Sequence, residues 1–351
     1  MVRFNHCLFT VGCVIAITSA GGYAHPDTTS ASHAQATTTT AESRSAVQPN
    51  DNRRAAGSVD RDAVTIRLRA AKGAWRPEGA NGPAVIVEAF GELNGPLTVP
   101  APLIRVTEGK MIAVSIRNEL EMPLRVNGLC ARDGASCPPL DVPPGQLREI
   151  RFPSGPAGTY HYWATSLGAP VPFRELAGAL VVDPRDGPLA PDRIFVITEW
   201  SDLTAAQLRA IVTADDANEA FLAARPRFMF VINGLSWPAT ERLQYRQGEI
   251  VRWRVINLSS QTHPMHLHGF YFRVTHAGNG LRDEPVNDGA GREVVTEVVR
   301  SGVCDFGVAN LASGVVHEGF EGRAQAAFPR ESLRRYPTRA CRARPRRGES
   351  E

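Results

Sequence analysis

The chain has 351 residues, 43% of them hydrophobic, and a formal net charge of +3. This composition is typical of a folded protein and excludes disorder throughout the chain. No apolar run approaches the roughly 20 residues that a membrane-spanning helix needs, so no membrane span is expected. The basic excess falls in the Arg-rich stretch after Arg323, and therefore no nucleic-acid-binding face is expected on the folded part.

Residues 1–24 have the order of features found in a secretory signal peptide. A weakly basic start at Arg3 precedes a mostly apolar stretch, and residues 22–24 supply a small-x-small cleavage pattern. We expect cleavage after Ala24 and export to the periplasm or the extracellular space; a buried N-terminal helix is the alternative. Residues 25–60, rich in Ser, Thr and Ala, are expected to form a disordered tether, because they contain too little apolar surface to offset the entropy of ordering.

From residue 61 onward, short apolar or alternating runs separated by Gly and Pro predict an all-β protein. A turn-rich boundary divides them into a first domain, residues 61–187, and a second, residues 188–302. The Ala-rich segment 203–224 predicts one or two short surface helices, with Ser201 and Asp202 as the first cap. The expected strands are 64–68, 85–87, 111–116, 147–152, 159–164 and 180–182 in the first domain, and 194–198, 228–232, 250–256, 266–274 and 294–299 in the second.

The two domains carry an internal sequence repeat. Gly109 and Asn118 bracket a predicted strand in the first domain, as Gly248 and Asn257 do in the second. The strand is followed by Pro-Leu-Arg-Val-Asn-Gly in one copy and by Pro-Met-His-Leu-His-Gly in the other. This ordered set of matches indicates a duplicated β-sandwich.

Cys130 and Cys137 flank a turn-like run in the first domain. Export would place the mature chain in an oxidising compartment, where closely spaced cysteines form disulfides. We therefore predict a local disulfide between these two residues. A metal site formed by the pair is the alternative, although no histidine lies near them in the sequence.

The most informative stretch contains His263, His266 and His268. Successive side chains of a strand point to opposite faces, so His266 and His268 are expected to share one face. Pro264 favours an extended conformation at His263, which is expected to bring a third imidazole nearby. Imidazole suits copper, zinc, iron and nickel, so these three residues are predicted to bind a metal. A solvated cluster without a function is the alternative.

The stretch His263-Pro264-Met265-His266-Leu267-His268-Gly269 resembles the copper-ligand motif in the last domain of multicopper oxidases. Residues 252–257, 102–109 and 158–163 are also similar to segments of that family. The resemblance implies two tandem cupredoxin-like Greek-key β-sandwiches with copper as the cofactor. It also implies oxidation of a small-molecule or metal-ion reductant coupled to O2 reduction. By position, His263 would bind a type 1 copper, and His266 and His268 would bind a three-copper cluster.

Several copper ligands of that family have no counterpart in this sequence. In the first repeat, Arg125 stands where the second has His266, and Asn127 stands where it has His268. A guanidinium has no free acceptor and cannot bind copper. Further along the first domain, Trp163 and Thr165 occupy the places of two more expected histidines. The nearby His161 is expected to be packed or hydrogen-bonded rather than a ligand.

The end of the chain departs further from the family pattern. The resemblance implies a strand bearing His-Cys-His, but Cys304 has no flanking histidine and the β alternation stops after Gly302. The second sandwich is therefore expected to lack its closing strands, and residues 303–351 to form an irregular Arg-rich tail. We hypothesise that the reading frame is damaged after about Val299. If neither alternative frame of the downstream DNA encodes His-Cys-His before a stop codon, this hypothesis is wrong.

Three functions follow from these patterns. The first is an exported copper oxidoreductase of the multicopper oxidase type, with activity impaired by the missing ligands. The second is a non-catalytic cupredoxin module that holds one copper. The third is a structural or assembly domain without a metal. The lineage favours the first, whereas the count of available ligands favours the second.

Overall fold

The computed structural model describes residues 45–132, 136–166, 174–187, 191–246, 248–268 and 270–300, and the backbone of 304–310. The predicted signal peptide, most of the predicted tether and the segment 311–351 lie outside these residues. Strands predominate in the described part, which confirms the all-β expectation. None of the helices in these ranges is both long and apolar enough to cross a membrane.

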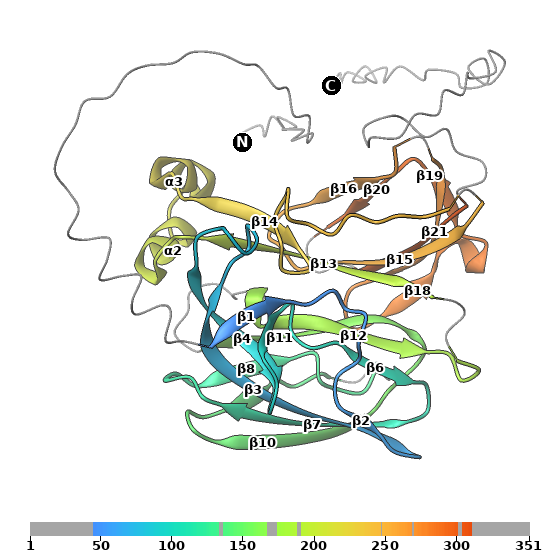
Figure 1. Cartoon of the computed structure of the whole chain (residues 1–351), viewed down its shortest axis with the longest axis horizontal. Coiled ribbons are helices and arrows are strands. Elements are labelled where there is room, and N and C mark those ends of the chain that lie inside the picture. Colours follow the sequence, from blue (N-terminus) through green and yellow to red (C-terminus); the bar gives the residue numbers. More distant parts are fainter. Residues whose placement is uncertain are drawn as a thin grey trace, which may run out of the picture. The chain divides into compact units, whose positions relative to one another are not determined.

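The first domain consists of two sheets with their apolar faces together (Figure 1). The seven-stranded sheet has the order β1-β5-β4-β3-β7-β10, with β2 paired to β3, and the five-stranded sheet has the order β6-β12-β11-β8-β9. The strands are β1 (Ala46–Pro49), β2 (Ser58–Val59), β3 (Ala63–Trp75), β4 (Val85–Glu92), β5 (Leu97–Val99), β6 (Ile104–Thr107), β7 (Met111–Asn118), β8 (Leu124–Asn127), β9 (Leu140–Val142), β10 (Leu147–Pro153), β11 (Gly158–Ser166) and β12 (Ala177–Asp183), with the short helix η1 (Arg174–Leu176) before β12.

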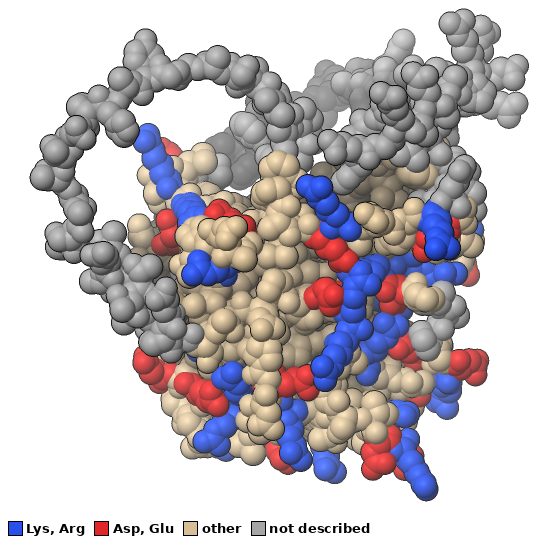
Figure 2. Space-filling model, viewed as in Figure 1, with Lys and Arg blue, Asp and Glu red and all other residues tan. Residues whose placement is uncertain are grey.

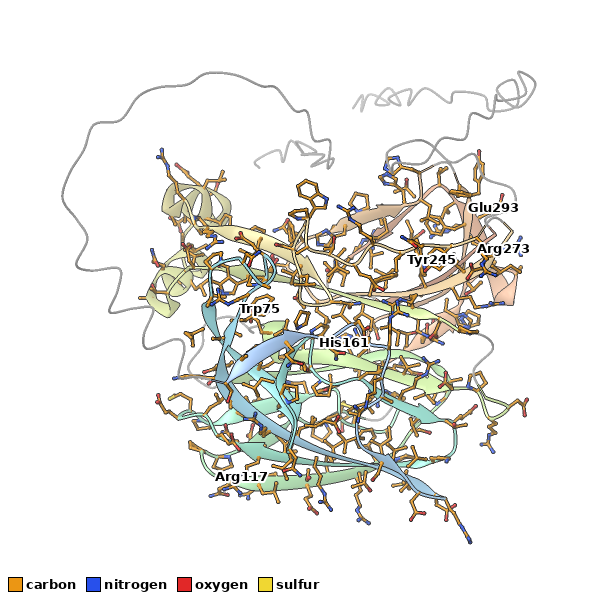
Figure 3. The ribbon with its side chains drawn as sticks, viewed as in Figure 1. Trp75, Arg117, His161, Tyr245, Arg273 and Glu293 are labelled. Atoms are coloured by element: carbon orange, nitrogen blue, oxygen red, sulfur yellow. A yellow bond between two sulfur atoms is a disulfide. The ribbon has the colours of Figure 1, made fainter. Side chains whose placement is uncertain are left out.

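Alternation along the strands builds the core of this domain. On β7, the side chains of Ile112, Val114 and Ile116 are at most 1% exposed, and the residues between them are partly exposed. Across the sandwich they belong to the same cluster as Tyr160 and Tyr162 of β11, which are fully buried. The period of two therefore places one apolar face of each sheet against the other. Side chains fill this space throughout the domain (Figure 3).

The second domain has a seven-stranded sheet of order β14-β13-β15-β21-β17-β18, with β19 paired to β17, and a separate pair β16-β20. Both α-helices lie between β13 and β14 in the sequence. The elements are β13 (Arg193–Ser201), α2 (Ala205–Val212), α3 (Ala217–Ala224), β14 (Phe228–Ile232), β15 (Ile250–Asn257), β16 (His263–His266), β17 (Phe272–Gly278), β18 (Asp283–Pro285), η2 (Val286–Gly289), β19 (Arg292–Val294), β20 (Thr296–Val299) and β21 (Cys304–Asn310).

The two predicted surface helices are present, but their cap differs from the expectation. The N-terminus of α2 is closed by Thr204 and Gln207, because the Thr204 Oγ1 accepts from the Gln207 N–H while the Gln207 Oε1 accepts from the Thr204 N–H. This is a reciprocal capping box. Asp202, which was expected to cap the helix, instead accepts a hydrogen bond from the backbone N–H of Arg227.

Three boundaries differ from the sequence-based expectation. Residues 46–49 and 58–59, expected within a disordered tether, form two strands. β1 pairs in parallel with β5 and β3, and β2 pairs antiparallel with β3. The single strand expected at 266–274 is divided into the end of β16 and the start of β17. Residues 304–310, expected to lie in an irregular tail, form β21 between β15 and β17. The β pattern therefore continues to Asn310. The damaged reading frame stays a hypothesis that the DNA sequence tests.

The internal repeat is confirmed by equivalent hydrogen bonds in the two domains. The Asn118 Nδ2 donates to the carbonyls of Met122 and Val142, and its Oδ1 accepts from the N–H of Leu120. Asn257 makes the same three bonds, donating to Gln261 and Val299 and accepting from Ser259. The buried Asn118 amide thus joins the loop after β7 to β9, and the buried Asn257 amide joins the loop after β15 to β20. This equivalence matches β7 with β15, β8 with β16, and β9 with β20.

The domains contact each other through an apolar layer and a buried ion network. The apolar layer joins the outer face of β12 to β13 and β15. In the network, Arg105 donates to both carboxylates of Asp183 and Asp192, at 2.7–2.8 Å for the shortest bonds. Arg254 of the second domain donates to Asp192 at 2.6 Å and to the Thr159 hydroxyl at 2.6 Å. The guanidinium groups therefore bridge the two domains.

Charges of both signs are interspersed on the molecular face shown in Figure 2. The described residues also include exposed ion pairs, such as Arg125 with Asp141 and Arg227 with Glu78.

Candidate metal site

His266 and His268 lie side by side at the end of the β16–β20 hairpin. His266 is the last residue of β16, and His268 follows in a turn. Their Nε2 atoms are 3.1 Å apart and their ring centroids 4.6 Å apart, and both side chains are exposed. The prediction that these two imidazoles share a face is confirmed. In the absence of a metal ion, the contact is a hydrogen bond between a protonated and an unprotonated nitrogen.

The separation of these two nitrogens matches the bite of a single metal ion. A copper or zinc ion binds imidazole nitrogen at about 2.0–2.1 Å. Two nitrogens 3.1 Å apart then subtend an angle of roughly 100° at the ion. That angle lies between the square-planar and tetrahedral values, both of which these metals adopt. The pair can therefore act as two neighbouring ligands of one ion after small adjustments of the rings.

His263 does not join this pair. It is an odd number of residues from His266, so the two side chains point to opposite faces of β16. The His263 Nε2 lies 2.8 Å from the hydroxyl of Ser259, and its ring meets Phe230 edge to face at 4.6 Å. Burial lowers the pKa of His263 below its ordinary value and so favours the neutral ring. Among the described residues, no group of three or more His, Cys, Asp or Glu side chains could hold a metal ion. The described geometry therefore separates His263 from the pair, and metal binding by the three residues stays a prediction.

The positions of the first domain that correspond to the histidine pair have other roles. The Arg125 guanidinium donates two hydrogen bonds to the Asp141 carboxylate, at 2.7 and 2.9 Å. Residues Asn127 and Trp163 are paired across β8 and β11, as are Arg125 and Thr165. None of these four residues is a histidine, as the sequence shows. In the structure they lie opposite one another on the paired strands β8 and β11.

His161 is packed, as expected. It lies on β11 (Figure 3), its side chain is buried, and its ring fills the space beside Gly280. A Cβ atom added at Gly280 would lie 2.2 Å from the Cε1 of His161. The imidazole therefore has a close packing partner in the second domain and is not free to move toward His266.

The cysteines do not provide a type 1 copper ligand in the described part of the chain. Cys130 and Cys137 form the predicted disulfide, so their sulfur atoms are not thiolates. Cys304 begins β21, where its backbone is opposite Ile256. Cys341 lies outside the described residues. The intense colour of a type 1 centre requires a cysteine thiolate on the copper.

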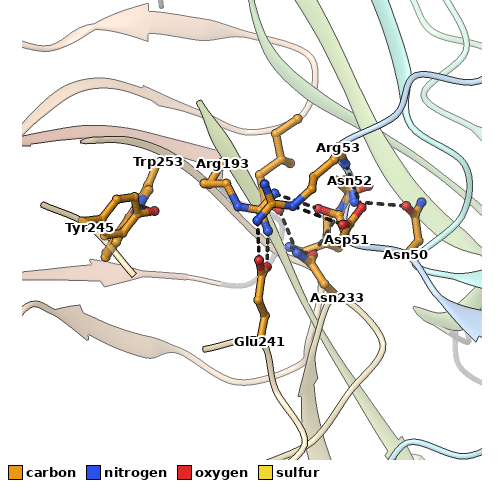
Figure 4. Close-up of polar contacts among 11 residues, drawn as sticks. Asn50, Asp51, Asn52, Arg53, Arg193, Asn233, Glu241, Tyr245 and Trp253 are labelled. Carbon is orange, nitrogen blue, oxygen red and sulfur yellow. Dashed lines mark hydrogen bonds and ion pairs between the residues drawn. The ribbon is translucent and has the colours of Figure 1, made fainter. Parts of the chain in front are cut away.

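Two neighbouring cavities open beside the histidine stretch, and no sequence pattern indicates them. One, of about 480 Å³, has apolar walls that include Phe195, Trp253 and Met265. The other, of about 50 Å³, shares Trp253 and Met265 and is also lined by His266. At the rim of the larger cavity, Glu241 accepts hydrogen bonds from Arg53 and Arg193 (Figure 4). Close by, the Trp253 indole donates to the Tyr245 hydroxyl at 3.1 Å.

Family models described as multicopper oxidase match residues 92–187 and residues 204–303. The chain belongs to the multicopper oxidase family. The chain is also 30% identical over 203 residues to a probable nitrite reductase-hydroxylamine oxidoreductase fusion protein of Kuenenia stuttgartiensis. The match covers 53% of this chain and 23% of that protein. The chain thus spans less than a quarter of the length of this curated relative.

Solved multicopper oxidases share the fold of this chain. The multicopper oxidase mgLAC superposes with a TM-score of 0.55 at 20% identity, covering 72% of this chain and 77% of that one. The blue copper oxidase from Nitrosomonas europaea gives 0.53 at 19%, with the same coverages. The copper nitrite reductase from the same organism gives 0.51 at 19%, covering 72% and 85%. These similarities identify the two domains as cupredoxin-like sandwiches.

Copper is the cofactor of this family, and the residues present fit only part of its copper set. The exposed His266 and His268 pair has the donor type and spacing for one ion. The first domain contributes Arg125, Asn127, Trp163 and Thr165 instead of imidazoles. The described residues therefore fit one ion at the pair and do not fit a four-copper assembly.

Proposed function

We propose that this chain is an exported copper-binding protein of the multicopper oxidase family that holds one copper ion at His266 and His268. The observation that carries the proposal is the 3.1 Å separation of the two Nε2 atoms. We also propose that oxidation of a small-molecule or metal-ion reductant, coupled to O2 reduction, is impaired in this chain. The reason is that the first domain has other residues at the four places where the family resemblance implies copper-binding histidines. The chain then acts as the non-catalytic cupredoxin module that the ligand count favours.

The protein's contribution at this site is positional. The β16–β20 pairing fixes His266, with its Cα opposite Thr296, and the turn after β16 holds His268 within contact distance. Both rings must be neutral to donate their lone pairs, so protons compete with the metal at this site. A bound copper ion would supply one-electron exchange. Because both rings are exposed, a dissolved metal ion can reach them without opening the fold.

Replacing both His266 and His268 with alanine should remove most of the bound copper and weaken binding by at least ~10-fold. Copper(II) titration of the full chain, followed by electron paramagnetic resonance and absorption, measures both stoichiometry and site type. The intact chain should bind one ion with no strong band at roughly 600 nm, because among the described side chains both cysteines are in a disulfide and neither can supply a thiolate.

His276→Ala is the matched control, because His276 lies on β17 and contacts the Thr275 hydroxyl rather than the pair. Its copper stoichiometry should equal that of the unmodified chain. Unchanged stoichiometry in the double variant would place the metal elsewhere, for example at His25 and His33 of the N-terminal segment. A strong band near 600 nm would refute the proposed site type.

Export is a separate part of the proposal, based on the signal-like order of residues 1–24. The secreted form should begin near His25, because the small-x-small pattern ends at Ala24. N-terminal sequencing of protein recovered from the periplasm or the medium measures this. Recovery of an exported chain that still begins at Met1 would contradict signal cleavage.

A further inference from the structure

The turn between β17 and β18 makes one of the contacts between the two domains. Gly280 in this turn lies against the buried ring of His161 on β11, and a Cβ atom added there would be 2.2 Å from the His161 Cε1. At the start of β18, the Asp283 carboxylate accepts a hydrogen bond from the Thr159 N–H of β11 at 2.7 Å. Asn279 precedes Gly280, so an Asn-Gly pair forms the part of the turn that meets β11.

An Asn-Gly pair can change covalently without an enzyme. A base removes the proton of the glycine N–H, and the nitrogen attacks the Cγ carbon of the preceding asparagine, which glycine permits because it has no Cβ atom to hinder the approach. The new C–N bond closes a cyclic imide, the Cγ–Nδ2 bond breaks, and the amide nitrogen takes up a proton and leaves as ammonia. Water then opens the imide at one of its two carbonyls and leaves aspartate or isoaspartate. The reaction therefore needs only water and a base such as hydroxide.

The geometry at Asn279 favours each step of this reaction. Asn279 is exposed, so base and water reach it and ammonia can leave. Its Oδ1 accepts hydrogen bonds from the Leu281 N–H at 3.2 Å and from the Arg282 N–H at 3.0 Å. Two donors on this oxygen stabilise the negative charge that develops on it during the attack. Among the described residues, no hydrogen bond uses the Gly280 N–H, so its proton can be removed without first breaking such a bond.

Two other exposed Asn-Gly pairs have a glycine nitrogen that is already engaged. They begin at Asn81 and Asn94. In each pair, the glycine N–H donates a hydrogen bond of 2.9 Å to the carbonyl three residues earlier. That bond has to open before a base can remove the proton, so only the small open fraction of molecules can react.

The remaining two Asn-Gly pairs are held by the fold. Asn127 is in β8, where its backbone is paired with β11. Asn233 is buried, its Nδ2 donates to the Ile194 carbonyl at 2.9 Å, and its Oδ1 accepts from the Val196 N–H at 2.9 Å. Ring closure at either place requires these bonds to break. Exposure, a free glycine nitrogen and a polarised carbonyl therefore coincide at Asn279.

We propose that Asn279 is a site of spontaneous deamidation, and that its isoaspartate product loosens the contact between the β17–β18 turn and β11. An isoaspartate adds one methylene group to the main chain directly before Gly280. The added length displaces Gly280 from the ring of His161, against which it fits closely. An aspartate keeps the ordinary main chain, and its carboxylate can still accept from the two N–H groups that Asn279 uses. This inference is independent of copper binding.

The first measurement compares the five Asn-Gly pairs of the chain, at residues 81, 94, 127, 233 and 279. The purified full chain is kept in mildly alkaline buffer, and mass spectrometry of its proteolytic peptides detects the exchange of each amide for a carboxyl group. Asn279 should convert at least ~10-fold faster than Asn81 and Asn94, because its amide oxygen has two donors and its glycine nitrogen is free. In concentrated urea these differences are lost, and the five rates should become similar. Conversion of Asn81 or Asn94 as fast as Asn279 in the folded chain, or faster conversion of Asn279 in urea than in the folded chain, would overturn the proposal.

The second measurement tests the effect on the domain contact and includes Asn279→Asp as the matched control. Hydrogen exchange at the Thr159 N–H is compared in fresh chain, in the isoaspartate form isolated from aged chain, and in the variant. Exchange should be at least ~10-fold faster in the isoaspartate form, and the variant should resemble the fresh chain. Asn279→Gln, whose longer side chain disfavours the ring, should keep slow exchange on ageing. Unchanged exchange in the isoaspartate form, or the same increase in Asn279→Asp or in aged Asn279→Gln, would overturn the proposed effect on β11.

Discussion

Asp192→Ala should lower the free energy of unfolding by about 3–5 kcal/mol, because it removes a buried carboxylate that accepts hydrogen bonds from two guanidinium groups. The Asp192 side chain is 3% exposed and receives hydrogen bonds from Arg105 at 2.8 Å and from Arg254 at 2.6 Å. Without the carboxylate, Arg254 loses a hydrogen bond within the second domain, and Arg105 loses its hydrogen bond to that domain while it keeps the one to Asp183. Urea unfolding followed by circular dichroism measures the loss.

The control for this prediction is Asp141→Ala, which removes an equally short ion pair with Arg125 at the surface. Asp141 is 51% exposed and Arg125 is 45% exposed, so this change should cost at most about 1 kcal/mol. Equal losses of stability in Asp192→Ala and Asp141→Ala would contradict the prediction. They would mean that burial does not determine how much each ion pair stabilises the fold, and that the Asp192 network is not a principal contact between the domains.

The effect of Asp192 should depend on pH in a defined direction. Burial by itself raises the pKa of Asp192, but hydrogen bonds and charges from Arg105 and Arg254 outweigh it and hold the pKa below its ordinary value. A carboxyl group whose pKa is lower in the folded state stabilises the fold above its unfolded pKa, about 3.9. That contribution is lost as the pH falls through the folded-state pKa. The difference between the native chain and Asp192→Ala should therefore be largest near neutral pH.

Gly234→Ala should be destabilising by about 3 kcal/mol or more, because it combines an unfavourable backbone angle with a direct overlap. Gly234 has φ +84°, and a Cβ there would lie 2.0 Å from the carbonyl oxygen of Val99 in the first domain. The left-handed conformation costs an alanine about 1–2 kcal/mol, and overpacking adds about 1–3 kcal/mol. The movement would also disturb the Gly234 carbonyl, which accepts from the Trp75 indole at 3.0 Å. The change in melting temperature measures the sum.

Gly145→Ala separates the two causes. Gly145 has φ +69°, but nothing lies within 4 Å of its added Cβ, so only the backbone term applies. Its cost should be about 1–2 kcal/mol. If Gly234→Ala were no worse than Gly145→Ala, the close approach of the two domains at Val99 would have to relax without cost.

Much of the fold could be predicted because burial follows the period of two. Strands such as β3 and β7 alternate between buried and more exposed residues, and their sequence patterns carry that information directly. The repeat was visible for a similar reason, since Asn118 and Asn257 each serve three backbone groups and only an amide of that length does so. Local signals of this kind depend on residues near one another in the chain.

The parts that could not be predicted depend on distant partners. β1 has one buried side chain, Val47, and forms because its backbone pairs with β5 and β3. β21 contains Gly307 within Cys304–Asn310, yet it is held on both edges by β15 and β17. A weakly patterned segment becomes a strand when two neighbours offer hydrogen bonds, and a single sequence does not reveal those neighbours.

The candidate site divides in the same way. The alternation rule placed His266 beside His268 correctly. Applied to His263, the same rule predicts the opposite face, and an odd separation outweighs closeness in sequence. The Phe230 ring and the Ser259 hydroxyl that hold His263 come from β14 and the loop after β15, so its surroundings required the tertiary structure.

Strand β12 has a consequence for how the two domains respond to local unfolding. All seven of its residues are buried, since Leu180 and Val182 face the core of the first sandwich while Ala179 and Val181 face the second domain. Detaching this strand would expose both layers at once and break its pairings with β11 and β6. Detaching β12 therefore costs the free energy of exposing both the core of the first sandwich and the apolar layer between the domains. β12 thereby joins the two sandwiches into a single cooperative folding unit.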